Sequence, residues 1–99
     1  MGEFEQLVLL AILRLDNNAY GMEIREEIEK CTKRDVSYGA VYTTLDRLTR
    51  KGYVAHKLGD ATPERGGRAK KYFRVVGAGK RALRSIQDAL SVMWDGVSL

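Results

Sequence analysis

The sequence is poor in the residues that build disulfides, metal sites and membrane spans. It has one cysteine, Cys31, one histidine, His56, and one proline, and its longest apolar run extends only from Leu7 to Leu13. A single cysteine cannot form an intramolecular disulfide, and one cysteine with one histidine cannot build a Cys/His metal cluster. The apolar run is too short to cross a bilayer and follows no basic segment, so it predicts neither a signal peptide nor a membrane helix. We therefore expect a cytoplasmic protein that binds no membrane, no metal and no other cofactor.

Catalytic groups are equally scarce. One histidine and one cysteine cannot supply a convincing Ser/His/Asp or Cys/His arrangement, and no acidic pair lies in an apolar setting. The stretch VGAGKRA at residues 76–82 contains glycines spaced as in nucleotide-binding loops. However, Arg81 stands where a phosphate-binding loop needs Ser or Thr, and Arg74 stands at the position of its first glycine. These glycines instead predict a tight turn between a strand and a helix, and the chain is not expected to be an enzyme.

What the sequence does contain is an uneven charge distribution. The 99 residues are 44% hydrophobic and 30% charged, which fits one small domain. Residues 1–36 hold five Lys or Arg against eight Asp or Glu, residues 37–74 hold nine against three, and residues 75–99 hold three against two. A basic block between acidic and neutral flanks is expected if one face meets a polyanion, although a solvated lysine-rich surface would give the same counts.

The hydrophobic pattern predicts a winged helix-turn-helix fold. Apolar residues recur at helical spacing in four segments, and two short segments alternate as strands do. Ser37 is a good helix N-cap and Gly52 a good helix stop. The predicted fold is mainly α with a small β-hairpin, with helices at residues 4–15, 20–31, 37–51 and 78–94 and strands at residues 53–58 and 71–76.

The third helix has a buried side and an unusual exposed side. At about 100° per residue, Val41, Leu45 and Leu48 share the side expected to face the core. The opposite side is small near its start and basic near its end, and it carries Gly39, Thr43, Asp46, Arg47 and Arg50, with Tyr42 at its edge. Short side chains would let the first turns approach base edges in a major groove, while arginines further along reach phosphates. The helix N-terminus at Ser37 would also favour a phosphate.

Hydroxyl groups add to the case for a helix that reads DNA. Tyr38, Tyr42, Thr43 and Thr44 could donate or accept hydrogen bonds with base edges. The simpler alternative is that the tyrosines pack at the edge of the core with solvated hydroxyls and that the arginines are solvated. Tyr38 lies closer to the buried side of the helix, so we expect it to pack.

The segment between the two strands predicts a basic wing at residues 59–71. Its cationic residues surround a Gly-Gly pair, and the candidate contacts are Arg65, Gly67, Arg68, Lys70 and Lys71. Glycines would let the backbone enter a narrow groove, where arginine is favoured by the negative potential. A solvated loop is the plain alternative. A winged helix that binds another protein through its acidic second helix is the main competing function, but such a protein has no need of this basic wing.

The last helix predicts a dimer interface. Apolar residues follow each other at steps of three and four and form a heptad-like seam of Leu83, Ile86, Leu90, Met93 and Val97, with Trp94 near its end. Packing against the chain's own domain would give a similar stripe. We expect pairing with a second copy instead, because three helices and a hairpin can already fill the core.

Four stretches of the sequence together resemble the PadR family of bacterial transcriptional regulators. They are LVLLAILRL, AYGMEIREEI, SYGAVYTTLDRLTRKGYV and ERGGRAKKYFRVVGAGKRAL, and they cover nearly the whole chain. The end of the third helix, LDRLTRKGYV, and the wing, GGRAKKYFRV, are the most specific when taken together. The sequence departs from the family at Thr43, where proline is frequent, and at Val76-Gly77, where Ser or Thr usually opens the last helix.

The resemblance implies a function as well as a fold. It implies a homodimer that binds pseudo-palindromic promoter DNA, usually as a repressor, with the C-terminal helix making most of the dimer contact. Carry-over to this sequence is firmest at Tyr42, Arg47, Gly67 and Arg68, and the departure at Thr43 bears on operator preference. Some short members bind aromatic or cationic drugs between subunits through a tryptophan, so Met93 and Trp94 are candidates for a pocket that binds a small aromatic effector. The other reading of Trp94 is an anchor of the dimer interface.

These predictions combine into one mechanism. Residues 1–76 would form the DNA-binding unit and residues 77–99 the dimerisation helix of the same structural unit. Two third helices would enter successive major grooves about one helical turn apart, while the wings hold the flanking backbone or minor groove. The alternative is a winged-helix module that binds proteins and not DNA.

Overall fold

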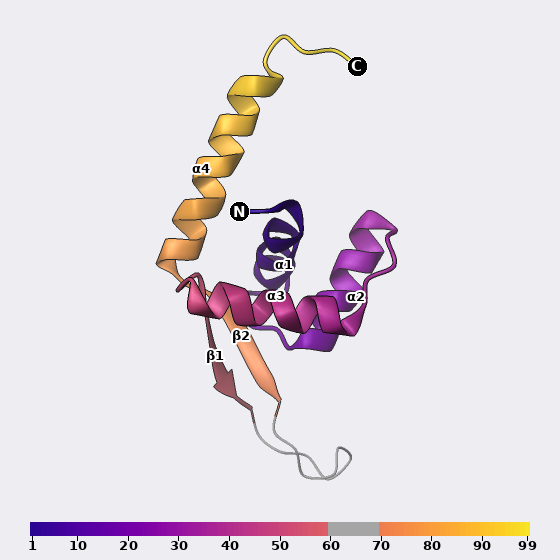
Figure 1. Cartoon of the computed structure of the whole chain (residues 1–99), viewed down its shortest axis with the longest axis vertical. Helices are drawn as coiled ribbons and strands as arrows, with labels where there is room; N and C mark the ends of the chain where they lie inside the picture. The colour runs from indigo at the N-terminus through magenta and orange to yellow at the C-terminus, as the bar shows by residue number, and fades with distance from the viewer. Residues whose placement is uncertain (60–69) are drawn as a thin grey trace.

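The computed structural model describes residues 1–59 and 70–99. In this part of the chain, the elements follow in the order α1 (Glu3–Arg14), α2 (Gly21–Thr32), α3 (Tyr38–Arg50), β1 (Val54–Leu58), β2 (Lys71–Val75) and α4 (Gly77–Trp94). Figure 1 shows α1, α2 and α3 packed together, the β1–β2 hairpin extending to one side of them, and α4 leading away on the other. Every boundary lies within one residue of the sequence prediction, and the winged helix-turn-helix architecture is confirmed.

Local sequence explains where the helices begin and end. The side-chain oxygen of Ser37 accepts a hydrogen bond from the backbone N–H of Ala40 at 3.1 Å, so the predicted cap of α3 is confirmed. After α3 the backbone of Gly52 takes a left-handed conformation with φ of 76°, which glycine adopts without steric cost. The α1–α2 turn uses Asp16 and Asn17 at φ of 61° and 54°, a region that these two residue types tolerate better than most.

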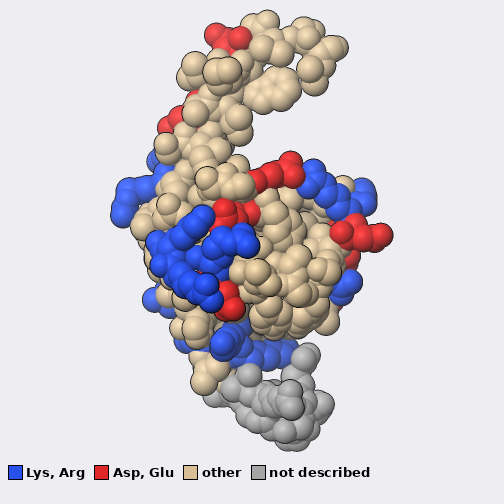
Figure 2. Space-filling model, viewed as in Figure 1, with Lys and Arg blue, Asp and Glu red and all other residues tan. Residues whose placement is uncertain are grey.

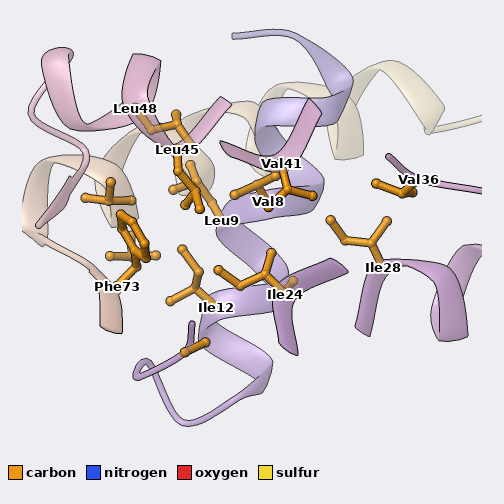
Figure 3. Close-up of a cluster of buried hydrophobic side chains, with 14 residues drawn as sticks. Val8, Leu9, Ile12, Ile24, Ile28, Val36, Val41, Leu45, Leu48 and Phe73 are labelled. Carbon is orange, nitrogen blue, oxygen red and sulfur yellow. The ribbon is translucent and has the colours of Figure 1, made fainter. Parts of the chain in front are cut away.

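The core lies between the three N-terminal helices and the base of the hairpin. Figure 3 shows the side chain of Ile12 from α1 next to that of Ile24 from α2, and Leu9 from α1 next to Leu45 from α3. Val41, Leu45 and Leu48 of α3 complete this cluster and are fully buried, as the helical spacing predicts. Burying one such aliphatic side chain contributes about 1.5–3 kcal/mol, so this cluster fixes how α3 sits on α1 and α2.

The hairpin is attached to the helical body at the turn between α1 and α2. Its strands pair antiparallel from Val54 opposite Val75 to Leu58 opposite Lys71. Two backbone hydrogen bonds join Ala19 and Phe73, at 2.7 and 3.1 Å. The side-chain amide of Asn17 donates to the carbonyl oxygen of Val75 and accepts from its N–H. These bonds hold the base of the hairpin against the turn between α1 and α2.

Helix α4 begins directly at the end of the hairpin and then leaves the core. A Cβ atom at the buried Gly79 would lie 2.4 Å from the carbonyl oxygen of Tyr53, so the absence of a side chain lets the helix start this close to the hairpin. The predicted strand-to-helix junction is thus confirmed, although its glycines lie inside the first helical turn. Leu83 still packs against the core, whereas the residues from Leu90 onward are exposed. In the part of the chain that is described, no helix is both long and apolar enough to span a membrane.

Candidate nucleic-acid interface

The exposed face of α3 has the composition that the helical wheel predicts. The five residues that the wheel assigns to this face are all exposed, and the opposite side is buried; the five are Gly39, Thr43, Asp46, Arg47 and Arg50. Tyr38, Ala40 and Tyr42 are exposed as well. Figure 2 shows mostly uncharged side chains over the N-terminal half of α3 and a cluster of blue, basic side chains over its C-terminal end. The helix therefore offers a neutral surface followed by a cationic one.

Thr44 does not belong to this face, and the prediction for it was wrong. Only 4% of its surface is exposed. Thr44 follows Val41 by three residues and precedes Leu48 by four, so it shares their side of the helix. With so little of its surface exposed, Thr44 is not available to a ligand outside.

Tyr38 and Tyr42 form a pair on the surface at the start of α3. Their ring centroids are 4.9 Å apart, and their hydroxyl oxygens lie 3.4 Å from each other. Tyr38 is exposed and packs on Tyr42, whereas the sequence predicted packing at the core. Tyr38 is the first residue of α3, and its ring contact is with Tyr42, one turn further along the same helix.

Tyr42 packs against the first turn of α2. The hydrogen bond that it shares with Tyr38, together with partial burial, raises the pKa of Tyr42 to about 12, so its phenol stays protonated at physiological pH. A Cβ atom at Gly21 would lie 2.9 Å from both Cζ and the hydroxyl oxygen of Tyr42. The tyrosine can therefore rest on the first turn of α2 only because Gly21 has no side chain. Sequence reasoning did not identify Gly21, since nothing in the helical pattern of α2 reveals what lies above it.

The cationic end of α3 is organised by a carboxylate that the sequence analysis missed. Glu5 of α1 is buried, and its Oε2 accepts a hydrogen bond from Nζ of Lys51 at 2.9 Å. A guanidinium nitrogen of Arg47 lies 4.0 Å from the same oxygen. The partners are separated by more than forty residues, so helical spacing could not reveal this contact.

The base of the wing carries an aromatic and cationic cluster. Nζ of Lys70 lies 3.6 Å above the ring centroid of Tyr20, and this ring meets Tyr72 edge-on at 5.6 Å between centroids. Lys71 is exposed on β2. The predicted contacts Arg65, Gly67 and Arg68 lie outside the described residues.

The seam predicted on α4 divides into a packed and an exposed half. Leu83 and Ile86 are partly covered and, with Leu90, line a groove that α1 borders through Leu10. The remaining seam residues are exposed, including 54% of the surface of Trp94, and a shallow hollow there is lined by Met93, Trp94 and Val97. Because α4 ends at Trp94, Val97 lies beyond the helix, and the predicted helical seam does not reach it. Figure 2 shows this helix extending from the body with few charged side chains. In a single chain this apolar surface faces solvent, and binding of an aromatic effector there stays a prediction.

Comparisons with known proteins agree with this geometry. The sequence matches the family model "Transcriptional regulator PadR-like family" over residues 9–85. A PadR-family transcriptional regulator from Eggerthella lenta is 25% identical, with a TM-score of 0.73 over 95% of this chain and 81% of that chain. A PadR-like transcription factor from Bacteroides fragilis is 22% identical, with a TM-score of 0.78 over 93% of this chain and 84% of that chain. None of the curated proteins matches the sequence.

A third solved structure supports the fold from a more distant sequence. F93 from STIV, a winged-helix DNA-binding protein, is 17% identical, with a TM-score of 0.72 over 91% of this chain and 89% of that chain. In the described residues, no three His, Cys, Asp or Glu side chains gather where they could hold a metal ion. The helical body, the hairpin wing and a family match over most of the sequence show that the chain belongs to the PadR-like family of winged-helix transcriptional regulators, which are not enzymes.

Proposed function

We propose that the protein is a homodimeric repressor that binds a pseudo-palindromic promoter sequence. The observation that carries this proposal is the exposed face of α3, which is uncharged in its N-terminal half and cationic at its end. A helix entering the major groove needs this order, because base edges must be approached closely while phosphates are reached by long cationic side chains. The hairpin that follows α3 carries further exposed basic residues, Lys57, Lys71 and Arg74.

Each part of the interface has a distinct role in this proposal. Tyr42 and Thr43 contact base edges, with Tyr38 and Gly39 beside them, and Ser37 places the start of α3 near a phosphate. Arg47 and Arg50 contact the DNA backbone. The wing at residues 59–71 contacts the flanking backbone or minor groove through Arg65, Gly67, Arg68, Lys70 and Lys71.

The apolar surface of α4 supports the homodimer. Leu90, Met93, Trp94 and Val97 are exposed in the single chain, and burying them against a second copy would remove them from water. Residues 77–99 then serve dimerisation, and residues 1–76 bind DNA. The two α3 helices enter successive major grooves about one helical turn apart, and the bound dimer represses by occluding the promoter.

Two protein variants, measured for binding to an operator obtained by selection, test which residues contact base edges and which contact the DNA backbone. Thr43→Ala should change the preference among operator sequences, whereas Arg68→Ala should weaken binding to every sequence and reduce the salt dependence. Arg84→Ala removes an exposed cation of α4 outside the proposed interface and serves as the matched control. If Arg68→Ala behaved like Arg84→Ala, the wing would have no role in DNA binding, and a protein partner would become the better proposal.

A further inference from the structure

Glu5 is a buried carboxylate at the cationic end of α3. It is only 6% exposed, although it lies in the first turn of α1. One carboxylate oxygen accepts from the backbone N–H of Gly2 at 3.0 Å, and the other accepts from Nζ of Lys51 at 2.9 Å. Arg47 lies 4.0 Å from this second oxygen. One carboxylate thus faces Arg47 of the helix proposed to enter DNA and Lys51, which directly follows that helix.

The carboxylate is ionised at physiological pH. The hydrogen bond from Lys51 lowers the pKa of Glu5 below its ordinary value, and this effect exceeds the opposing effect of burial. Because the carboxylate is shielded from water, its attraction for the two cations is screened less than that of a surface ion pair. Both cations are nevertheless about half exposed, so a phosphate approaching α3 would compete with Glu5 for them.

Two charged residues close to this cluster in the sequence, Arg50 and Glu3, make no ion pair with its members. Arg50, one residue before Lys51, makes no ion pair with any residue in the described ranges. Glu3, two residues before Glu5, is exposed and pairs with Arg34, at 2.8 Å. The chain therefore contains a paired and an unpaired cation side by side, as well as a buried and an exposed carboxylate on the same helical turn.

On the basis of the DNA-binding function proposed above, we propose that Glu5 is a specificity-determining residue that withholds Lys51 and Arg47 from phosphates of non-operator DNA. Binding to arbitrary DNA depends on phosphate contacts, so each withheld cation weakens it. At an operator, base contacts of the first turns of α3 fix the position of the helix, which limits how far extra phosphate contacts can form. Glu5 therefore lowers affinity for arbitrary DNA more than affinity for the operator.

The test compares Glu5→Gln with Glu3→Gln, which removes the same charge from the same turn. Gln retains an acceptor for Gly2 but no longer holds the cations. Anisotropy titrations use a random-sequence duplex and a selected operator duplex at several salt concentrations. One added phosphate contact makes the slope of log K against log salt concentration steeper by about 0.9. Over the decade from 1 M down to 0.1 M salt, this slope corresponds to binding that is about eightfold tighter. We expect a change of this size for Glu5→Gln on random DNA, a smaller one on the operator, and a smaller one for Glu3→Gln on either.

Equal effects of the two variants, or equal tightening on both duplexes, would overturn this role of Glu5. If the wild-type chain bound neither duplex, the DNA-binding function itself would fail, and that result is distinct from the first. A second comparison does not require Glu5→Gln to fold. Lys51→Gln should reduce the salt dependence on random DNA by less than Arg50→Gln, because Lys51 is already held by Glu5. An equal or larger reduction for Lys51→Gln would contradict the proposal.

Discussion

Gly21→Ala tests whether α2 positions Tyr42 for DNA binding. The new Cβ atom would lie 2.9 Å from Cζ and the hydroxyl oxygen of Tyr42 and 3.2 Å from Cε2. Ordinary van der Waals contacts begin near 3.4 Å, so the ring must move by at least several tenths of an ångström. It can do so easily, because Tyr42 is 41% exposed and the contact is at the far end of its side chain.

We therefore expect Gly21→Ala to change the stability of the fold little and to weaken binding to the operator. Alanine is favoured over glycine in helices by up to about 1 kcal/mol, which offsets the lost ring contact, so we expect the free energy of unfolding to change by no more than about 1 kcal/mol. A displaced hydroxyl loses one hydrogen bond to DNA, worth about 0.5–1.5 kcal/mol, and operator affinity should fall about two- to twelvefold. Because the ring also moves away from Tyr38, the pKa of Tyr42 should fall from about 12 toward 10.

Three assays on one preparation measure these effects. They are thermal melting, ultraviolet titration of tyrosinate, and anisotropy with operator DNA. Gly39→Ala is the control for melting and titration, because a Cβ atom at Gly39 would meet no atom within 4 Å. An unchanged tyrosine titration together with unchanged operator affinity would refute the idea that Gly21 holds Tyr42. A large loss of stability would instead assign Gly21 to packing alone.

Three further predictions concern α4 and α1. Gly79→Ala places a Cβ atom 2.4 Å from the backbone oxygen of Tyr53, and overpacking of about 1–3 kcal/mol should lower the melting temperature by about 5–20 °C in calorimetry. Leu90→Lys should convert the proposed dimer into a monomer in sedimentation equilibrium without lowering the helix content; a dimer that persisted would contradict the proposed α4 interface. Because the pKa of Glu5 is lowered in the folded chain, its ionised form stabilises the fold above about pH 4.5, and this stabilisation is lost as the pH falls through the folded pKa. The free energies of unfolding of wild type and Glu5→Gln, measured in acid titrations, should therefore converge at low pH.

Local patterns were sufficient to predict the elements of the fold. The spacing of Val41, Leu45 and Leu48 identified the buried side of α3, because a regular helix repeats its faces with a known period. Ser37 and Gly52 marked the ends of that helix through backbone chemistry that involves only neighbouring residues. The family resemblance and the charge distribution then indicated α3 and the wing as the candidate DNA-binding surface.

Contacts between distant segments could not be predicted in this way. Glu5 meets Lys51, and Gly21 supports Tyr42, only because packing of the core brings α1 and α2 against α3. Thr44 was misplaced for a related reason. A polar residue type suggested an exposed position, but its place beside the apolar stripe decides its burial. The finer geometry of the candidate interface thus depends on tertiary packing, which helical spacing does not encode.

The central claim is that the chain binds DNA specifically as a symmetric dimer. The most direct measurement is an anisotropy titration of the full chain against a random duplex pool at several salt concentrations, followed by sequencing of the bound fraction. Specific binding by a symmetric dimer should weaken steeply with salt and should enrich an inverted repeat whose half-sites lie about one helical turn apart. Absence of binding even at low salt, or binding that enriches no sequence, would contradict this claim.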